Sequence, residues 1–193
     1  MPKVVDAQAQ RRQIRSAAQH VFSRRGVSGT GLTHVAEAVG MGRSSLYHYY
    51  PDKASLVRDL VRDLLVDEER VFRAALQADV GALERIERLA GRLAEMFEEW
   101  SRAGRMIFDL RASDARLFRP FFKRVRRELA AVIAEGQASG EVDPGLQPEL
   151  AAATLIGAVD GLLLQRLVDP RAFPDVAALR GELVRLARRS LAP

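Results

Sequence analysis

The apolar residues of this chain repeat with the period of an α-helix over almost its whole length. Ile14, Ala17, Ala18, Val21 and Phe22 fall at positions i, i+3, i+4, i+7 and i+8, which form the buried stripe of an amphipathic helix. No stretch alternates between apolar and polar residues for long enough to indicate a β-strand. The pattern therefore predicts an all-α fold with about nine helices.

Glycines divide the first part of the chain into three short helices. The first helix is expected to end at Gly26, because glycine adopts the left-handed conformation that closes many helices. Thr30 is placed to cap the N-terminus of the second helix. A tight glycine turn at 40–42 follows, and a third helix over 43–49 ends before a proline. These elements predict an N-terminal three-helix bundle, residues 1–51.

Residues 52–193 are expected to form a second helical domain. Asp52 is the expected N-cap of a long helix over 52–77, which links the two domains. Whether Pro120 kinks a helix or begins one is left open by the sequence. The remaining helices are predicted at about 82–103, 105–118, 120–139, 147–168 and 174–191.

The net charge of +5 resides entirely in the first 60 residues, which hold nine basic and four acidic side chains. The rest of the chain has 21 of each, so its charges cancel. This asymmetry fits a polyanionic partner, although a solvated basic face explains it as well. The chain has no cysteine, no recognisable signal peptide and no uninterrupted apolar run of membrane-spanning length, so we expect a cytoplasmic protein without a membrane partner.

Two short helices joined by a glycine turn form a helix-turn-helix, whose second helix enters the DNA major groove. Two blocks of sequence, VAEAVG at 35–40 and LYHYYPDK at 46–53, stand at the spacing found in one family of regulators. On these blocks the chain resembles the tetracycline-repressor (TetR/AcrR) family. The resemblance implies a DNA-binding N-terminal domain and a helical C-terminal domain that binds a small molecule and forms a dimer.

The DNA-contacting residues follow from residue type and from this resemblance. Arg43 can pair with guanine or with phosphate, and small serines beside it let the helix approach the groove closely. The resemblance implies that positions 43–45 read bases, that Tyr47, Tyr49 and Lys53 hold phosphates, and that Tyr50 is a buried aromatic. The full set of expected DNA-binding residues is Thr33, Arg43, Ser44, Ser45, Tyr47, His48, Tyr49 and Lys53.

The C-terminal domain is expected to contain an apolar effector pocket, mainly because of the resemblance. Aromatic and sulfur side chains gather on three consecutive predicted helices, although the core of a helical bundle would show the same enrichment. The expected pocket residues are Phe97, Trp100, Met106, Ile107, Phe108, Leu117, Phe118, Phe121 and Phe122.

The last two predicted helices are the candidates for a dimer interface. Small residues recur every four positions on the first of them, and apolar residues form a stripe on the second, although packing within one chain remains an alternative. Asp160 interrupts the first stripe and needs a partner if it is buried; a helix cap or a hydrogen bond between subunits is favoured there over ligand binding. The expected interface residues are Ala153, Gly157, Gly161, Leu162, Val176, Leu179, Leu183 and Leu186.

Together these features predict a one-component transcriptional regulator that binds a palindromic operator as a homodimer and is released by an apolar small molecule. Repression is favoured over activation. The alternative is a helical protein-interaction adaptor that does not bind DNA. No metal site, cofactor or enzymatic activity is expected, because the sequence contains no catalytic triad pattern, HExxH motif or phosphate-binding loop.

Overall fold

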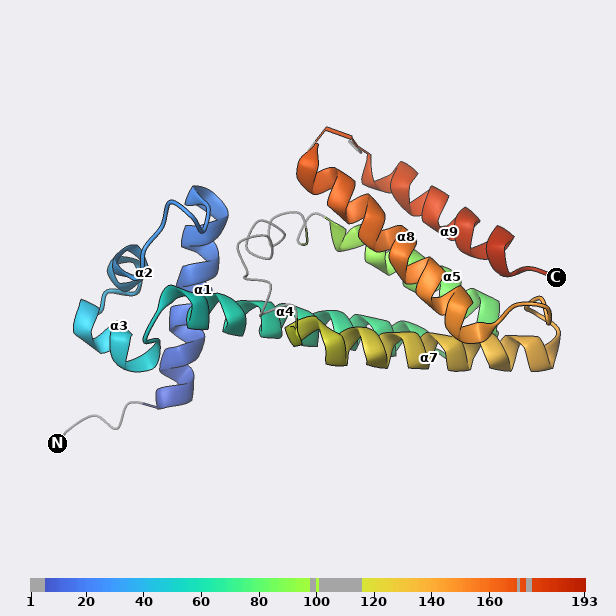
Figure 1. The fold of residues 1–193 in the computed structure, drawn as a ribbon, viewed down its shortest axis with the longest axis horizontal. Helices are drawn as coiled ribbons and strands as arrows, with labels where there is room; N and C mark the ends of the chain where they lie inside the picture. The colour runs from blue at the N-terminus through green and yellow to red at the C-terminus, as the bar shows by residue number, and fades with distance from the viewer. Residues whose placement is uncertain (1–5, 98–99, 101–115, 170, 173–174) are drawn as a thin grey trace. The chain divides into compact units, whose positions relative to one another are not determined.

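The computed structural model describes residues 6–97, 100, 116–169, 171–172 and 175–193. Within these residues the chain forms eight helices and no strands, which confirms the predicted all-α fold (Figure 1). The described residues group into two compact units, of which the first has residues 6–64 and 116–117 and the second has residues 65–97, 100 and those from Phe118 onward. The predicted helix over 105–118 lies mostly outside the described residues.

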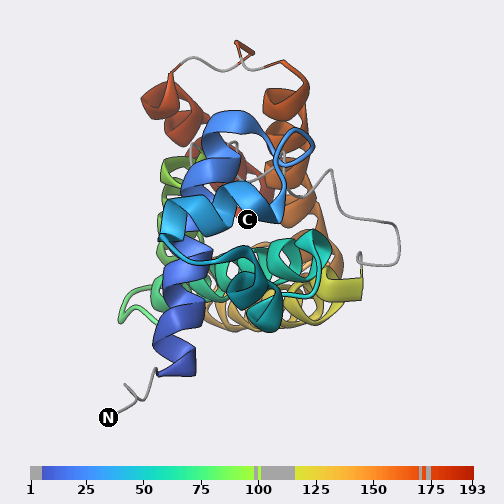
Figure 2. The same ribbon diagram turned by 90° about the vertical axis from the view of Figure 1, so that its left-hand side faces the viewer.

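The first unit consists of α1 (Ala7–Arg25), α2 (Leu32–Val39), α3 (Arg43–Tyr49) and the first part of α4 (Lys53–Leu76). Helix α2 packs against both α1 and α3, as the blue and cyan ribbons in Figure 2 show. The core of this unit is small and mainly apolar, with the side chains of Ile14, Phe22, Val35, Leu46 and Leu56 at most 2% exposed.

The connections between these helices depend on two glycines and on one correction to the sequence analysis. Gly26 and Gly40 both have φ of 75°, which only glycine adopts without strain, and they close α1 and α2. Thr30 was expected to cap α2, but its hydroxyl donates to the carbonyl of Gly26 at 2.6 Å and is buried. Gly31 takes the cap position instead, and its amide donates to Nδ1 of His34 at 3.1 Å.

Helix α4 begins as the sequence predicted and is held to α1 by ion pairs. The carboxylate of Asp52 accepts a hydrogen bond from the Ser55 amide at 2.6 Å, so Asp52 is the expected cap. Two arginines of α1 pair with two aspartates one turn apart on α4, namely Arg11 with Asp59 and Arg15 with Asp63.

The second unit contains α5 (Ala82–Glu95), α7 (Phe118–Ser139), α8 (Pro148–Val168), α9 (Val176–Leu191) and the remainder of α4. Helix α5 packs against α9 and α7, and α7 packs against α8 (Figure 1). Pro120 lies in the first turn of α7, where its missing N–H costs no helical hydrogen bond. The core of this unit includes Ile86, Leu89, Val125, Leu129 and Ile133.

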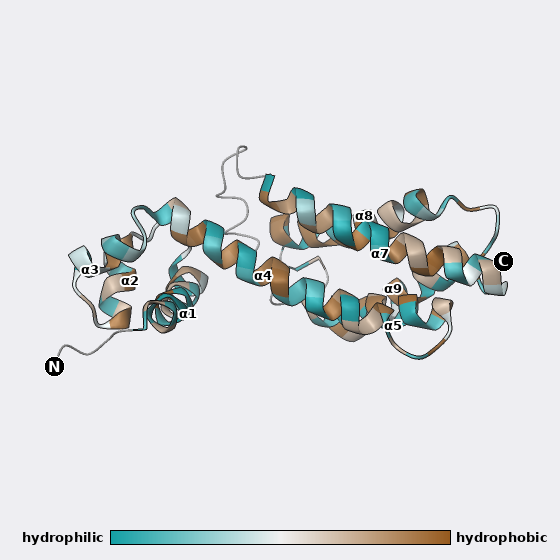
Figure 3. Cartoon of the chain, turned by 90° about the horizontal axis from the view of Figure 1, so that it is seen from below, coloured by the Kyte–Doolittle hydropathy of each residue, from teal (hydrophilic) through white to brown (hydrophobic). Residues whose placement is uncertain are grey.

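Helix α8 is unusually apolar for a helix that buries so little of itself in the chain. Among the described residues it is the one helix long and apolar enough to cross a bilayer by length and composition, although Glu149, Asp160 and Arg166 interrupt its apolar run. Only Ala152 and Ile156 are buried, whereas Leu150, Leu164 and Val168 are at least half exposed. By contrast, Figure 3 shows teal and brown segments alternating along α4, as expected of a helix with one polar and one apolar face.

Candidate nucleic-acid interface and effector cavity

Helix α3 is anchored by two side chains that point into the core of the first unit. Leu46 is fully buried and Tyr50, which follows it one turn later, is 1% exposed. The Tyr50 hydroxyl donates to the Asp59 carboxylate on α4 at 3.2 Å. Tyr50 is therefore a core aromatic, and α3 is fixed by one face while the rest of its circumference remains accessible.

The accessible face of α3 carries five of the side chains that the sequence predicts to contact DNA. Arg43, Ser44, Ser45, Tyr47 and His48 are all exposed. The guanidinium of Arg43 lies over the Tyr47 ring, with its carbon 5.5 Å from the ring centre. This stacking, one helical turn apart, orders the arginine while leaving its hydrogen-bond donors available.

Of the three remaining candidates, one is exposed and two are half-buried. Thr33 is exposed on α2, and Tyr49 is half-buried, with its ring edge-on to that of His48. Lys53 is half-buried, and its ammonium donates to the carbonyl of Val27 at 2.8 Å. An ammonium has three donors, so Lys53 retains the capacity to bind a phosphate while it holds the loop before α2.

Several basic side chains of the first unit are used inside the protein, which the sequence analysis did not anticipate. Arg11 pairs with Asp59 and also lies over the rings of Tyr49 and Tyr50, at 6.0 and 5.1 Å. These contacts hold Arg11 against α4 and the two aromatic rings. The sequence could have predicted that His34 caps α2. This residue stands three positions after Gly31, and a side chain at that position can accept a hydrogen bond from the amide at the start of the helix.

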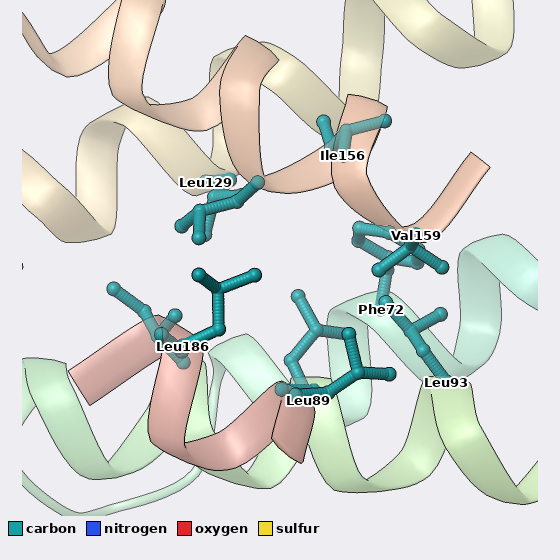
Figure 4. A pocket seen from close by; sticks show the side chains of 12 residues that line it. Phe72, Leu89, Leu93, Leu129, Ile156, Val159 and Leu186 are labelled. Atoms are coloured by element: carbon teal, nitrogen blue, oxygen red, sulfur yellow. The ribbon is translucent and has the colours of Figure 1, made fainter. Parts of the chain in front are cut away.

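The second unit has a half-open apolar cavity of about 30 Å³ between α4, α5, α7, α8 and α9. Figure 4 shows the labelled side chains converging on it from these helices. This volume holds about one water molecule and is far below the several hundred Å³ of a ligand pocket. A small molecule can therefore enter only if the helices or their side chains move apart. The cavity is lined by Phe72, Ile86, Leu89, Ala90, Leu93, Leu129, Leu155, Ile156, Val159, Leu183, Leu186 and Ala187.

The aromatic residues selected from the sequence do not line this cavity. Phe97 and Phe121 are buried, and Phe121 packs edge-on against Phe72 with the ring centres 6.2 Å apart. Phe121 therefore contacts the cavity wall through Phe72 without lining the cavity itself. The other predicted residues, Trp100, Leu117, Phe118 and Phe122, are half-buried, and Met106, Ile107 and Phe108 lie outside the described residues.

Two carboxyl groups on the helices around the cavity are partly removed from solvent. Burial raises the pKa of Glu68 on α4 to about 8, and the negative charge of Asp160 on α8 adds to the rise. Asp160 stands on an exposed part of α8, but partial burial of its carboxyl group raises the pKa of Asp160 to about 6. Glu68 escaped the sequence analysis, although it stands four residues before Phe72 and four after Leu64, on the apolar face of α4.

The residues expected at a dimer interface divide into two groups. Gly157, Gly161, Ala153, Leu162 and Val176 are exposed or half-exposed, and an added side-chain carbon at either glycine meets nothing within 4 Å. Leu186 is 42% exposed although one side of it lines the cavity.

Two of the expected interface residues belong to the core of the single chain, which corrects the sequence analysis. Leu179 and Leu183 are 8% and 4% exposed, because α9 turns this face toward α5. Neither is therefore available to a partner subunit.

Comparison with known proteins identifies this architecture. The family described as "Bacterial regulatory proteins, tetR family" matches residues 14–60, and "BetI-type transcriptional repressor, C-terminal" matches residues 110–192. The HTH-type transcriptional regulator TtgR of Pseudomonas putida is 27% identical over 192 residues, covering 92% of this chain and 88% of its own.

Solved structures share the fold along nearly the whole chain. A TetR/AcrR-family regulator from Thermobifida fusca aligns with a TM-score of 0.81 and 23% identity, covering 93% of this chain and 97% of its own. A regulator from Saccharomonospora viridis, solved in complex with choline, aligns with a TM-score of 0.80 and 21% identity, covering 96% and 99%.

The fold, the exposed face of α3 and these relatives define a DNA-binding transcriptional regulator. The chain belongs to the TetR/AcrR family of bacterial regulators. Membership sets aside the alternative of an adaptor without DNA binding, since the matched relatives are regulators of transcription.

Proposed function

We propose that this protein is a cytoplasmic repressor that binds a palindromic operator as a homodimer and leaves it when a small molecule enters the second unit. Residues 1–51 read the DNA, residues 52–193 sense the effector and dimerise, and the helix over 52–77 couples the two. The observation that carries the proposal is the exposed polar face of α3 on a helix anchored by Leu46.

The DNA contacts follow from this exposed face. Arg43 pairs with a base or a phosphate, Ser44 and Ser45 allow close approach, and His48 extends the face by one turn. Tyr47 and Tyr49 donate their hydroxyls to phosphate oxygens. Thr33 adds a contact from α2, and Lys53 binds phosphate with the donors that the Val27 carbonyl does not use.

A second copy of the chain is the occupant that best fits the uncovered face of α8. The face combines exposed leucine and valine with two glycines whose surroundings are open, so another helix can approach closely. One recognition helix contacts only a few base pairs, and two copies related by a twofold axis read a palindrome. Burying α8 in this way also accounts for a helix that is apolar enough for a bilayer.

The effector role is supported by the cavity and by a neighbour of the same fold that was solved with choline. Because the cavity is nearly filled, a bound molecule must separate the helices around it, and α4 contributes Phe72 to its wall. Displacement of α4 changes the separation of the two recognition helices in the dimer. Crystal structures with identical separations in the bound and free forms would refute this mechanism.

The test of DNA binding is fluorescence anisotropy of the purified protein on DNA upstream of its own gene, across a salt series with a scrambled competitor. We expect specific binding whose log–log salt slope is about −0.9 for each phosphate contact. Tyr47→Phe and Lys53→Ala remove phosphate contacts and are expected to weaken binding to all sequences. No binding at low salt would remove the basis of the proposal.

Arg43→Ala is expected to reduce the preference for the operator over scrambled DNA by about tenfold for each half-site. The reason is that a bidentate arginine–guanine pair discriminates between bases, whereas a phosphate contact does not. The measurement is the ratio of the two dissociation constants in competition anisotropy. Arg70→Ala on α4 removes the same charge from an exposed site in the second unit and serves as the control. Equal weakening on both DNAs would assign Arg43 to a phosphate.

A further inference from the structure

Glu68 is a half-buried acid on the apolar face of α4, and one of its carboxyl oxygens is buried without a hydrogen-bond partner. Its Oε2 atom is inaccessible to solvent and accepts no hydrogen bond. An ionised carboxylate in such a place costs several kcal/mol unless a cation or several donors compensate it. In the free protein Glu68 therefore keeps a proton at neutral pH, in keeping with its pKa of about 8.

The charges around Glu68 do not supply this compensation within the described residues. Asp160 on α8 is the charged group that acts on it, and it is also negative. The neighbours of Glu68 on α4 are occupied elsewhere, since Asp67 pairs with Arg70 and Glu69 pairs with Arg73 and Arg124. The site thus has negative potential and no cation of its own in the described part of the chain.

Both acids lie next to the walls of the apolar cavity. Phe72 follows Glu68 by four residues on α4, and Asp160 follows Ile156 by four residues on α8, so each acid stands one helical turn from a residue that lines the cavity. These lining side chains are labelled in Figure 4. A second buried side-chain atom without a hydrogen-bond partner is Nε1 of Trp100, which belongs to the same unit.

We propose that the effector of this protein is an organic cation with an apolar tail, whose positive group is held by Glu68 and Asp160 and whose tail fills the cavity beside Phe72. This inference rests on the proposed function and names the chemical class of its effector. Binding exchanges the Glu68 proton for the cation: the carboxyl O–H bond breaks, the proton passes to solvent, and an ion pair forms between carboxylate and ligand.

The probe is hexyltrimethylammonium, compared with 1-heptanol and hexanesulfonate as neutral and anionic molecules of similar length. Titration calorimetry on the full-length protein, together with the fluorescence of Trp100, the single tryptophan, reports binding. We expect the cation to bind and the sulfonate not to bind. Affinity should rise with pH between 6 and 8, by up to about tenfold per pH unit, because the cation selects ionised Glu68.

Proton release provides a readout that a merely structural acid would not give. Calorimetry in buffers of different ionisation enthalpy should show release of up to one proton per site. Glu68→Gln is expected to weaken cation binding at least tenfold and to abolish this release, and Asp160→Asn to weaken binding less. Asp67→Asn removes an exposed charge from the same helix and should bind like the parent protein.

Three results would overturn the inference: no binding of the cation, equal binding of 1-heptanol, or unchanged cation binding in Glu68→Gln. The operator assay separates this failure from failure of the proposed function. A protein that binds its operator and is released by a neutral molecule keeps the function and refutes the cation. A protein that binds the cation but no DNA keeps the site and refutes the regulator.

Discussion

Replacing Glu68 by glutamine is expected to raise the free energy of unfolding by about 3.5 kcal/mol more at pH 8 than at pH 5. Burial holds the pKa of Glu68 at about 8 in the folded chain, against 4.5 when it is exposed. Between these pH values the unfolded chain has lost the proton and the folded chain keeps it. Stability therefore falls as pH rises through this window, and glutamine, which has no proton to lose, removes this part of the fall.

Urea unfolding of both proteins at pH 5, 6, 7 and 8, at one fixed protein concentration, measures the effect. The free energies of unfolding of the parent protein and of Glu68→Gln should differ more and more as the pH rises. Asp67→Asn, which changes an exposed carboxylate on the same helix, is the matched control and should follow the parent curve. Parallel curves for the parent and Glu68→Gln would show that Glu68 is ionised in the folded protein, and that it has a partner.

The DNA-reading part could be predicted in detail because its determinants are local. The apolar positions of α2 and α3 fix which faces are buried, so the exposure of Arg43, Ser44 and Tyr47 follows from the burial of Leu46. The sequence does not show which group each charged side chain contacts in the folded protein. Arg11 and Lys53 look alike as basic residues, and only the folded structure shows Arg11 on aromatic rings and Lys53 on a carbonyl.

The second unit was harder to predict because helical periodicity shows that a face is buried without showing its partner. The stripe of α9 was assigned to a dimer, and the structure turns Leu179 and Leu183 toward α5. The aromatic residues suggested a pocket, whereas the cavity is lined mainly by aliphatic side chains. Asp160 was visible in the sequence as a charge in an apolar run, but its relation to Glu68 requires the packing of α4 and α8.

The double variant Gly157→Leu, Gly161→Leu is expected to convert the dimer to a monomer and to weaken operator binding about a thousandfold. Within the chain a side chain at either position meets no neighbouring atom within 4 Å, and leucine favours the helix more than glycine does. The fold should therefore persist. In the proposed dimer the same side chains stand where a second α8 approaches, and they hold the two helices apart.

Sedimentation equilibrium gives the oligomeric state, and anisotropy on the operator gives the affinity. Affinity falls because a monomer places one recognition helix on one half-site and loses the effective concentration that dimerisation gives the second. Ala134→Leu adds an equally large side chain at an exposed position of α7 and should leave both measurements unchanged. A double variant that remains dimeric and binds normally would move the interface away from the glycine face of α8, and the apolar surface of that helix would then require another occupant.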